Sequence, residues 1–366
     1  MRLGSEMISR IRINGYKSIE QCDLKFNRIN VLIGSNGAGK SNFISFFVML
    51  QNILSQNMAV FVGQSGLDAL FFNGRKQTAE ISAEVFFGTN SYGFELVPTD
   101  DNRLIFRREY FGYHGAFENI STVSSGHSES LWHKGVSNKI SQYVVPILEK
   151  QSWRVYHFHD TSRFAPVKTE HNLANDKFLT ANASNLAAFL YRLKKNFTNS
   201  YFEILEAIRL IAPFFDDFEL EPNENNPEKI VLKWRQKGCE DIFNASQLSD
   251  GTLRFICLAT LLLQPVELQP VTIIVDEPEL GLHPYAIAVF AEMVKRASHR
   301  KQIIISTQSV EMLNEFDVED VIVVNRDQER SVFQRLDADD LRDWLDNDYS
   351  LGELWNKNVL GGRLSL

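Results

Sequence analysis

The stretch Gly34-Ser35-Asn36-Gly37-Ala38-Gly39-Lys40-Ser41 decides the fold of this chain. It has the spacing G-x-x-x-x-G-K-S, in which glycines let backbone N–H groups close around phosphate oxygens. The apolar run Ile29–Ile33 precedes it as a predicted strand, and a helix-compatible run follows it. That helix would point its positive N-terminal end at the phosphates. The stretch therefore predicts a nucleoside triphosphate site between a strand and a helix.

The residue types of this loop have distinct predicted roles. Lys40 would reach the β- and γ-phosphates, and the Ser41 hydroxyl would ligate Mg²⁺. The residues predicted to hold the nucleotide here are Asn36, Gly37, Ala38, Gly39, Lys40, Ser41 and Asn42. The alternative is a chance glycine-rich turn, which the flanking strand and helix disfavour.

Length and composition are those of an ordinary globular protein, with 366 residues, 44% apolar and 23% charged. The net charge of −8 argues against a broadly basic nucleic-acid surface, although a local patch stays open. Three cysteines without a C-x-x-C pair argue against a disulfide framework or zinc site and fit a reducing compartment. We find no signal peptide and no apolar run of membrane-spanning length. We therefore expect a cytoplasmic protein with no membrane partner.

The hydrophobic pattern outlines the organisation of the chain. Strand-like runs separated by turn residues predict an antiparallel meander over residues 79–87, 92–97 and 103–110. Residues 112–140 are polar and rich in Gly, Ser and His, and we expect a mobile loop there. Helical periodicity dominates 181–215. From residue 246 onward helices alternate with apolar strands, which is typical of a parallel sheet covered by helices.

Two further elements complete the predicted site. Val271–Glu277 is an apolar strand that ends in adjacent carboxylates. Beside a phosphate loop, Asp276 would hold the Mg²⁺ shell and Glu277 would orient and polarise the attacking water. Acidic strand ends also occur as surface punctuation, but the phosphate loop upstream favours the catalytic interpretation.

The second element is Leu248-Ser249-Asp250-Gly251-Thr252, which opens a predicted helix. A hydroxyl and backbone N–H groups at a helix N-terminus can receive a γ-phosphate, so Ser249, Asp250 and Gly251 are predicted nucleotide-binding residues. The alternative is a plain helix cap, since Ser249 or Asp250 can satisfy the helix without any ligand. The position of this cap before the Asp-Glu strand end favours the phosphate interpretation.

Together these residues resemble the RecF/SMC/OLD-like branch of ABC-type ATPases, often described as AAA family ATPases, whose signature motif is usually written L-S-G-G-Q. The resemblance rests on Ile13–Ile19, Gly34–Ser41, Leu248–Arg254 and Asp276–Pro284. The phrases Trp153–Arg163, Leu351–Trp355 and Gly361–Arg363 resemble a small stand-alone bacterial subgroup without a long coiled coil or a TOPRIM nuclease domain. The resemblance implies an α/β P-loop NTPase of the ABC-ATPase type. We expect a mixed central sheet flanked by helices, an antiparallel β subdomain and a helical insertion.

On this pattern we divide the chain into four segments. They are an N-terminal ATPase lobe with the P-loop and the β meander (1–110), an inserted loop and helical subdomain (111–240), a C-terminal ATPase lobe with the signature and the acidic strand end (241–330), and a tail packed on the core (331–366).

Two places depart from simple expectations. ABC ATPases usually carry a histidine after the strand that follows the Asp-Glu element, whereas here the strand leads into Gln308. Glutamine can hydrogen-bond a γ-phosphate but cannot become cationic, so we expect Gln308 to sense phosphate and turnover to be slow.

A metal interpretation is possible for His157, His159 and Asp160, but the sequence offers no third well-spaced ligand, and hydrogen bonding is favoured.

The resemblance implies ATP and Mg²⁺ as cofactors and leaves two functions open. The first is an ATP-hydrolysing switch: two chains sandwich ATP between one chain's phosphate loop and the other's Ser249 cap, as a homodimer or higher homo-oligomer. That switch would control a separate effector, a nuclease or toxin subunit, in DNA repair or anti-phage defence. The second is a nucleotide-gated scaffold with little turnover, which Gln308 keeps open and Glu277 opposes. A transporter subunit is disfavoured by the long interval between the two lobes, and a nucleic-acid partner stays open.

Overall fold

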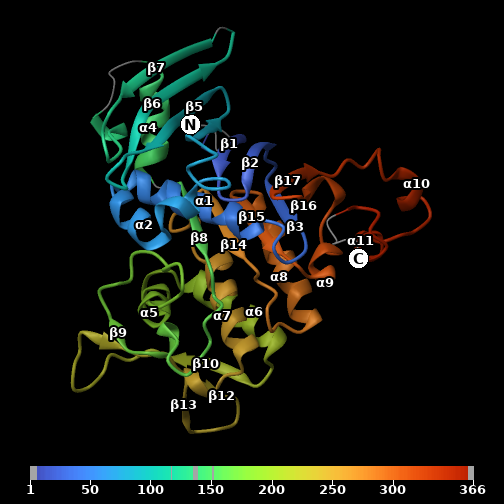
Figure 1. Cartoon of the computed structure of the whole chain (residues 1–366). Coiled ribbons are helices and arrows are strands. Elements are labelled where there is room, and N and C mark those ends of the chain that lie inside the picture. Colours follow the sequence, from blue (N-terminus) through green and yellow to red (C-terminus); the bar gives the residue numbers. More distant parts are fainter. Residues whose placement is uncertain (1–5, 117, 135–138, 151, 362–366) are drawn as a thin grey trace. The chain divides into compact units, whose positions relative to one another are not determined.

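The chain forms two compact units, each built from separate stretches of sequence. The computed structural model describes residues 6–116, 118–134, 139–150 and 152–361 (Figure 1). The first unit comprises Met1–Val155, Pro270–Ile274 and Lys301–Leu366, and the second comprises Tyr156–Gln269 and Val275–Arg300. The four-segment division stays a prediction. Of the phrase Gly361–Arg363, Gly362 and Arg363 lie outside the described residues.

The central sheet has six strands in the order β17-β16-β3-β15-β14-β8. The strands are β3 (Ile29–Ile33), β8 (Trp153–Tyr156), β14 (Thr272–Asp276), β15 (Gln302–Thr307), β16 (Val321–Asp327) and β17 (Arg330–Arg335). β3 runs parallel to both β15 and β16, whereas β17 is antiparallel to β16, so the sheet is mixed as predicted. All five residues of β3 are buried, which explains its uninterrupted apolar sequence.

A second six-stranded sheet, in the order β2-β1-β4-β5-β6-β7, is antiparallel throughout and contains the predicted meander. Its strands are β1 (Arg10–Tyr16), β2 (Ile19–Lys25), β4 (Ile81–Phe87), β5 (Asn90–Pro98), β6 (Leu104–His114) and β7 (Glu118–Ser124). β7 lies where the polar composition predicts a loop, and for these residues that prediction was wrong. The free edge of β6 supplies backbone partners, so a largely exposed polar segment pairs as a strand.

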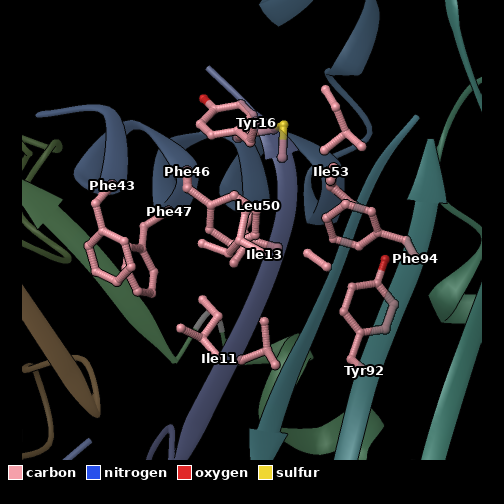
Figure 2. Close-up of a cluster of buried hydrophobic side chains, with 14 of the residues drawn as sticks. Ile11, Ile13, Tyr16, Phe43, Phe46, Phe47, Leu50, Ile53, Tyr92 and Phe94 are labelled. Carbon is pink, nitrogen blue, oxygen red and sulfur yellow. The ribbon is translucent and has the colours of Figure 1, made fainter. Parts of the chain in front are cut away.

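The helix that follows the phosphate loop, α1 (Lys40–Leu54), packs against this antiparallel sheet. Figure 2 shows its aromatic side chains Phe43, Phe46 and Phe47 in one cluster with residues of β1 and β5. Phe46 lies edge-on to Tyr16 at a centroid separation of 5.6 Å and stacks on Phe94 at 6.5 Å. Burying one such side chain stabilises the fold by roughly 1.5–3 kcal/mol, so α1 holds the end of the phosphate loop firmly.

The remaining helices of the first unit are α2 (Met58–Ser65), α3 (Leu67–Leu70), α4 (Ser141–Glu149), α9 (Val310–Leu313), α10 (Arg342–Leu345) and α11 (Leu351–Asn356). The C-terminal segment packs through Leu351, Leu354 and Trp355 into a cluster with Ile33 and Leu313. No helix in the described part of the chain has the length and apolar character needed to cross a membrane.

The second unit is mainly helical, as the periodicity predicts. Its helices are α5 (Leu186–Asn196), α6 (Thr198–Ile211), α7 (Asp250–Leu263) and α8 (Pro284–Ser298). Small antiparallel pairings accompany them: β10 (Phe215–Glu219), β12 (Lys233–Gln236) and β13 (Ile242–Asn244) form one sheet, and β9 (His171–Asn172) pairs with β11 (Lys229–Ile230). Helix α7 packs against both α6 and α8, and most of its residues are buried.

Candidate functional site

The phosphate loop in the first unit is shaped by close packing that only glycine permits. Gly39 precedes α1 with φ 114°, and a Cβ there would lie 1.9 Å from Ser331 Oγ. At Gly34 a Cβ would lie 2.4 Å from the Val324 carbonyl oxygen. Gly37 also has positive φ (78°), but a Cβ there would meet nothing within 4 Å. The first and last glycines of the motif are therefore required by strands β16 and β17, while the loop's middle is open.

A buried hydroxyl network supports this loop. Ser331 Oγ donates to the Ala38 carbonyl oxygen at 2.6 Å and lies 2.7 Å from Ser18 Oγ. Asn42 Nδ2 donates to Ser18 Oγ at 2.7 Å, so this side chain is part of the network, and its role in nucleotide binding stays a prediction. Ser18 falls within the phrase Ile13–Ile19 that carries part of the family resemblance, whereas nothing in the sequence singled out Ser331.

Lys40 is held by backbone carbonyl oxygens of its own loop. Its side chain is nearly buried, and Nζ donates to the carbonyl oxygens of Gly34 at 2.7 Å and Ser35 at 3.2 Å. The neighbouring residues Asn36, Gly37 and Ser41 are exposed. The loop thus combines a buried ammonium group with solvent-accessible backbone and an exposed serine. These residue types and this arrangement fit a nucleoside triphosphate with its Mg²⁺.

Gln308 follows β15 directly, and Gly34 follows β3 directly. Because these neighbouring strands are parallel and Thr307 pairs with Ile33, the two residues emerge at the same edge of the sheet. Gln308 is exposed, and the next residue, Ser309, caps α9 by accepting a hydrogen bond from Met312 N at 3.1 Å. The first unit thus brings Gln308 to the edge where the phosphate loop begins.

The signature-like segment lies in the second unit and caps α7. Ser249 Oγ accepts a hydrogen bond from Thr252 N at 3.2 Å, so the local geometry is a helix N-cap. Ser249 and Asp250 are nevertheless exposed, and the phosphate interpretation stays a prediction. At Gly251 a Cβ would lie 2.3 Å from the Gly281 carbonyl oxygen, so this glycine is required by the close approach of the turn after β14.

The acidic strand end has an unusual backbone. Asp276 is the last residue of β14 and is half-buried, as is Glu277. Glu277 adopts φ 43°, a left-handed conformation that costs a non-glycine residue about 1–3 kcal/mol and that clusters at functional sites. The chain then turns into α8, whose N-cap His283 accepts a hydrogen bond from Tyr285 N at Nδ1.

The segment 157–160, which follows β8 and contains His157 and His159, is hydrogen-bonded to the end of β14 and to α7. His159 Nε2 lies 2.9 Å from the Asp276 carbonyl oxygen. The buried Arg254 of α7 donates to the carbonyl oxygens of Phe158 at 2.9 Å and His159 at 3.1 Å, and burial lowers its pKa. Burial, together with the neighbouring His159, also lowers the pKa of His157. Within the described residues no cluster of three or more His, Cys, Asp or Glu side chains occurs that could hold a metal ion.

Comparisons with known proteins agree with this α/β P-loop NTPase fold. Residues 29–314 match a family model described as "AAA domain, putative AbiEii toxin, Type IV TA system". The chain belongs to that family. No curated protein sequence matches it.

Solved structures with the same fold include heads of SMC proteins. A crystal structure of an Smc head bound to the C-terminal winged-helix domain of ScpA matches with a TM-score of 0.58 and 14% identity, covering 92% of this chain and 99% of the other. An Smc head with an extended coiled coil, bound to the C-terminal domain of ScpA and derived from Pyrococcus furiosus, gives a TM-score of 0.55 and 14% identity, covering 93% of this chain and 99% of the other. An Smc head from Pyrococcus yayanosii gives 0.53 and 12%, with the same coverage.

Proposed function

We propose that this protein is an ATP-hydrolysing switch whose two copies close head-to-tail around ATP. The observation that carries the proposal is the contrast between two fixed but differently exposed motifs. One unit presents a phosphate loop with a buried Lys40, and the other presents an exposed Ser249 at the start of a buried helix. An exposed helix N-terminus favours an anion. A second copy carrying ATP would supply that anion.

Each proposed role follows from residue chemistry. Lys40 contacts the β- and γ-phosphates, and the oxygen ligands Ser41 and Asp276 hold Mg²⁺, which neutralises charge on the phosphates when bound. Glu277 orients and polarises the attacking water, and the strained backbone at this residue is typical of a catalytic position. Gln308 hydrogen-bonds the γ-phosphate without adding charge, so turnover is slow.

A separate effector, a nuclease or toxin subunit, is the proposed target of the switch, with DNA repair or anti-phage defence as its setting. The family description supports the defence setting, since it names the AbiEii toxin and a type IV toxin–antitoxin system. A nucleic-acid partner has weaker support. On the antiparallel sheet Arg10 pairs with Asp23, and Arg107 pairs with Glu80 and Glu95, so acidic side chains balance the charge of these two arginines.

The second candidate, a nucleotide-gated scaffold with little turnover, is favoured by Gln308 and opposed by Glu277. One experiment separates the two functions: steady-state phosphate release by the purified chain and by Glu277→Gln. Removing a catalytic base lowers kcat by about a hundredfold or more. Glu277→Gln should therefore bind ATP and lose turnover. Measurable phosphate release at equal rates in both proteins would contradict the switch. No measurable release by either protein would favour the scaffold.

A further inference from the structure

The signature-like cap of α7 carries an acid that the usual motif lacks. Where L-S-G-G-Q has its first glycine, this chain has Asp250, the first residue of α7 after the Ser249 cap. A carboxylate in the first turn stabilises a helix, because it complements the positive end of the helix dipole. It also repels a phosphate brought to the same helix end. The proposed site therefore contains a like-charge conflict.

Lys168 lies where it can offset this charge. It ends a short 3₁₀ turn, Pro166–Lys168, and its Nζ lies 3.6 Å from Asp250 Oδ1. Its side chain is only 7% exposed, whereas the Asp250 side chain is 65% exposed. Nζ also donates to the Thr161 carbonyl oxygen at 2.5 Å, which fixes the ammonium from the other side. The lysine is thus an enclosed cation beside an open carboxylate.

The segment that carries Lys168 is attached to α7 at two points one helical turn apart. Lys168 meets Asp250 at the first point. Arg254 holds the carbonyl oxygens of Phe158 and His159 at the second. Asp160 lies near the same lysine: its pKa is lowered mainly by hydrogen bonds from Ser162 and in part by the charge of Lys168. Because both attachments lie within one unit, the position of Lys168 relative to the cap is built into the fold.

We propose that Lys168 is a positioning residue of the signature motif, whose ammonium offsets Asp250 so that the Ser249 cap can receive the γ-phosphate of ATP held by a second copy. The inference rests on the proposed ATP-driven pairing of two chains. Lys168 and Asp250 act as one neutral unit in it: the lysine is needed because the acid is there. Removing the acid removes the need for the lysine.

The test is ATP-dependent dimerisation, measured by sedimentation in variants that all carry Glu277→Gln to suppress turnover. Lys168→Met should weaken dimerisation about tenfold or more, the effect of one lost charge-assisted contact. Asp250→Gly should tighten it, and Lys168→Met with Asp250→Gly should recover to within about threefold of the parent. Lys168→Arg should retain most of it. Lys177→Met, at an exposed lysine of the same unit, is the matched control and should behave as the parent.

Each outcome decides. If the double variant stays as weak as Lys168→Met, the lysine acts through its bond to Thr161 alone, and charge compensation is wrong even though the proposed function stands. If Lys168→Met dimerises as strongly as the parent, charge compensation by Lys168 is also wrong. ATP affinity of the monomer, measured with a fluorescent ATP analogue, should be equal across the set, which separates a docking defect from misfolding. A parent that binds ATP but never dimerises would overturn the proposed function, and this inference with it.

Discussion

The phosphate loop and the signature-like cap both place glycines at the start of a helix, yet the protein builds them differently. At the phosphate loop, Gly39 is pressed against Ser331, and the lysine of the motif is nearly buried. At the cap, Ser249 and Asp250 face solvent, and only Gly251 is packed, against the turn at Gly281. One motif is a tightly packed loop with its own buried cation, and the other is an exposed helix N-terminus.

This difference favours separate roles for the two units, with nucleotide binding in the first and assembly with a second copy in the second. A pocket whose polar groups are held by buried hydrogen bonds is preorganised and can bind its ligand alone. An exposed helix N-terminus gains most when a partner brings an anion and excludes water. We therefore expect substitutions in the first unit to change ATP affinity of the single chain, and substitutions at the cap to change assembly only.

The largest effect on nucleotide binding should come from Lys40→Ala. It removes the ammonium held by the Gly34 and Ser35 carbonyl oxygens and a charge-assisted contact of roughly 1.5–3 kcal/mol, so ATP affinity should fall about tenfold or more. Calorimetric titration of ATP measures this, with Lys25→Ala at an exposed position as the control. An unchanged ATP affinity in Lys40→Ala would contradict the assignment of this loop as the ATP-binding site.

A smaller effect is expected from Ser331→Ala, which leaves the Ala38 carbonyl oxygen without its buried donor. Such a loss costs about 1–3 kcal/mol of folding stability, and because the loop loosens, ATP affinity should fall about threefold. Thermal unfolding and ATP titration are the two measurements, and Ser125→Ala at an exposed turn is the matched control. If only the control-level change is seen, the hydroxyl network does not support the loop.

The smallest effect concerns pH and the strand that backs Gly34. Asp320 lies just before β16, and burial, together with Asp317, raises its pKa to about 6. A carboxyl with a raised pKa favours the folded state while protonated, so its contribution is present at about pH 4 and lost as pH rises through about 6. After discounting for solvent, Asp320→Asn should stabilise the fold by about 1 kcal/mol at pH 7 and by nothing at pH 4. Melting curves at both pH values test this, and Asp346→Asn is the exposed control.

Local patterns predicted much of this molecule. The run Ile29–Ile33, the loop glycines and the acidic strand end each carry their signal within a few residues, and the mixed sheet followed from the family resemblance. The supporting contacts could not be predicted in this way. Ser331 contacts the loop from a position about 290 residues further along the chain, and Lys168 reaches Asp250 from a short 3₁₀ turn about 80 residues before it. β7 was missed because edge pairing, rather than its own sequence, makes it a strand.

The central claim is that the Ser249 cap completes a nucleotide site on a second copy, and light scattering with and without ATP tests it most directly. In a Glu277→Gln parent, ATP should double the molar mass. Adding Ser249→Arg places a bulky side chain where the γ-phosphate must dock, so the chain should stay monomeric while its own ATP affinity changes by no more than about twofold, because the loop of each chain binds independently. If the Ser249→Arg variant dimerises with ATP as well as its parent, the cap only begins a helix and the shared site does not exist.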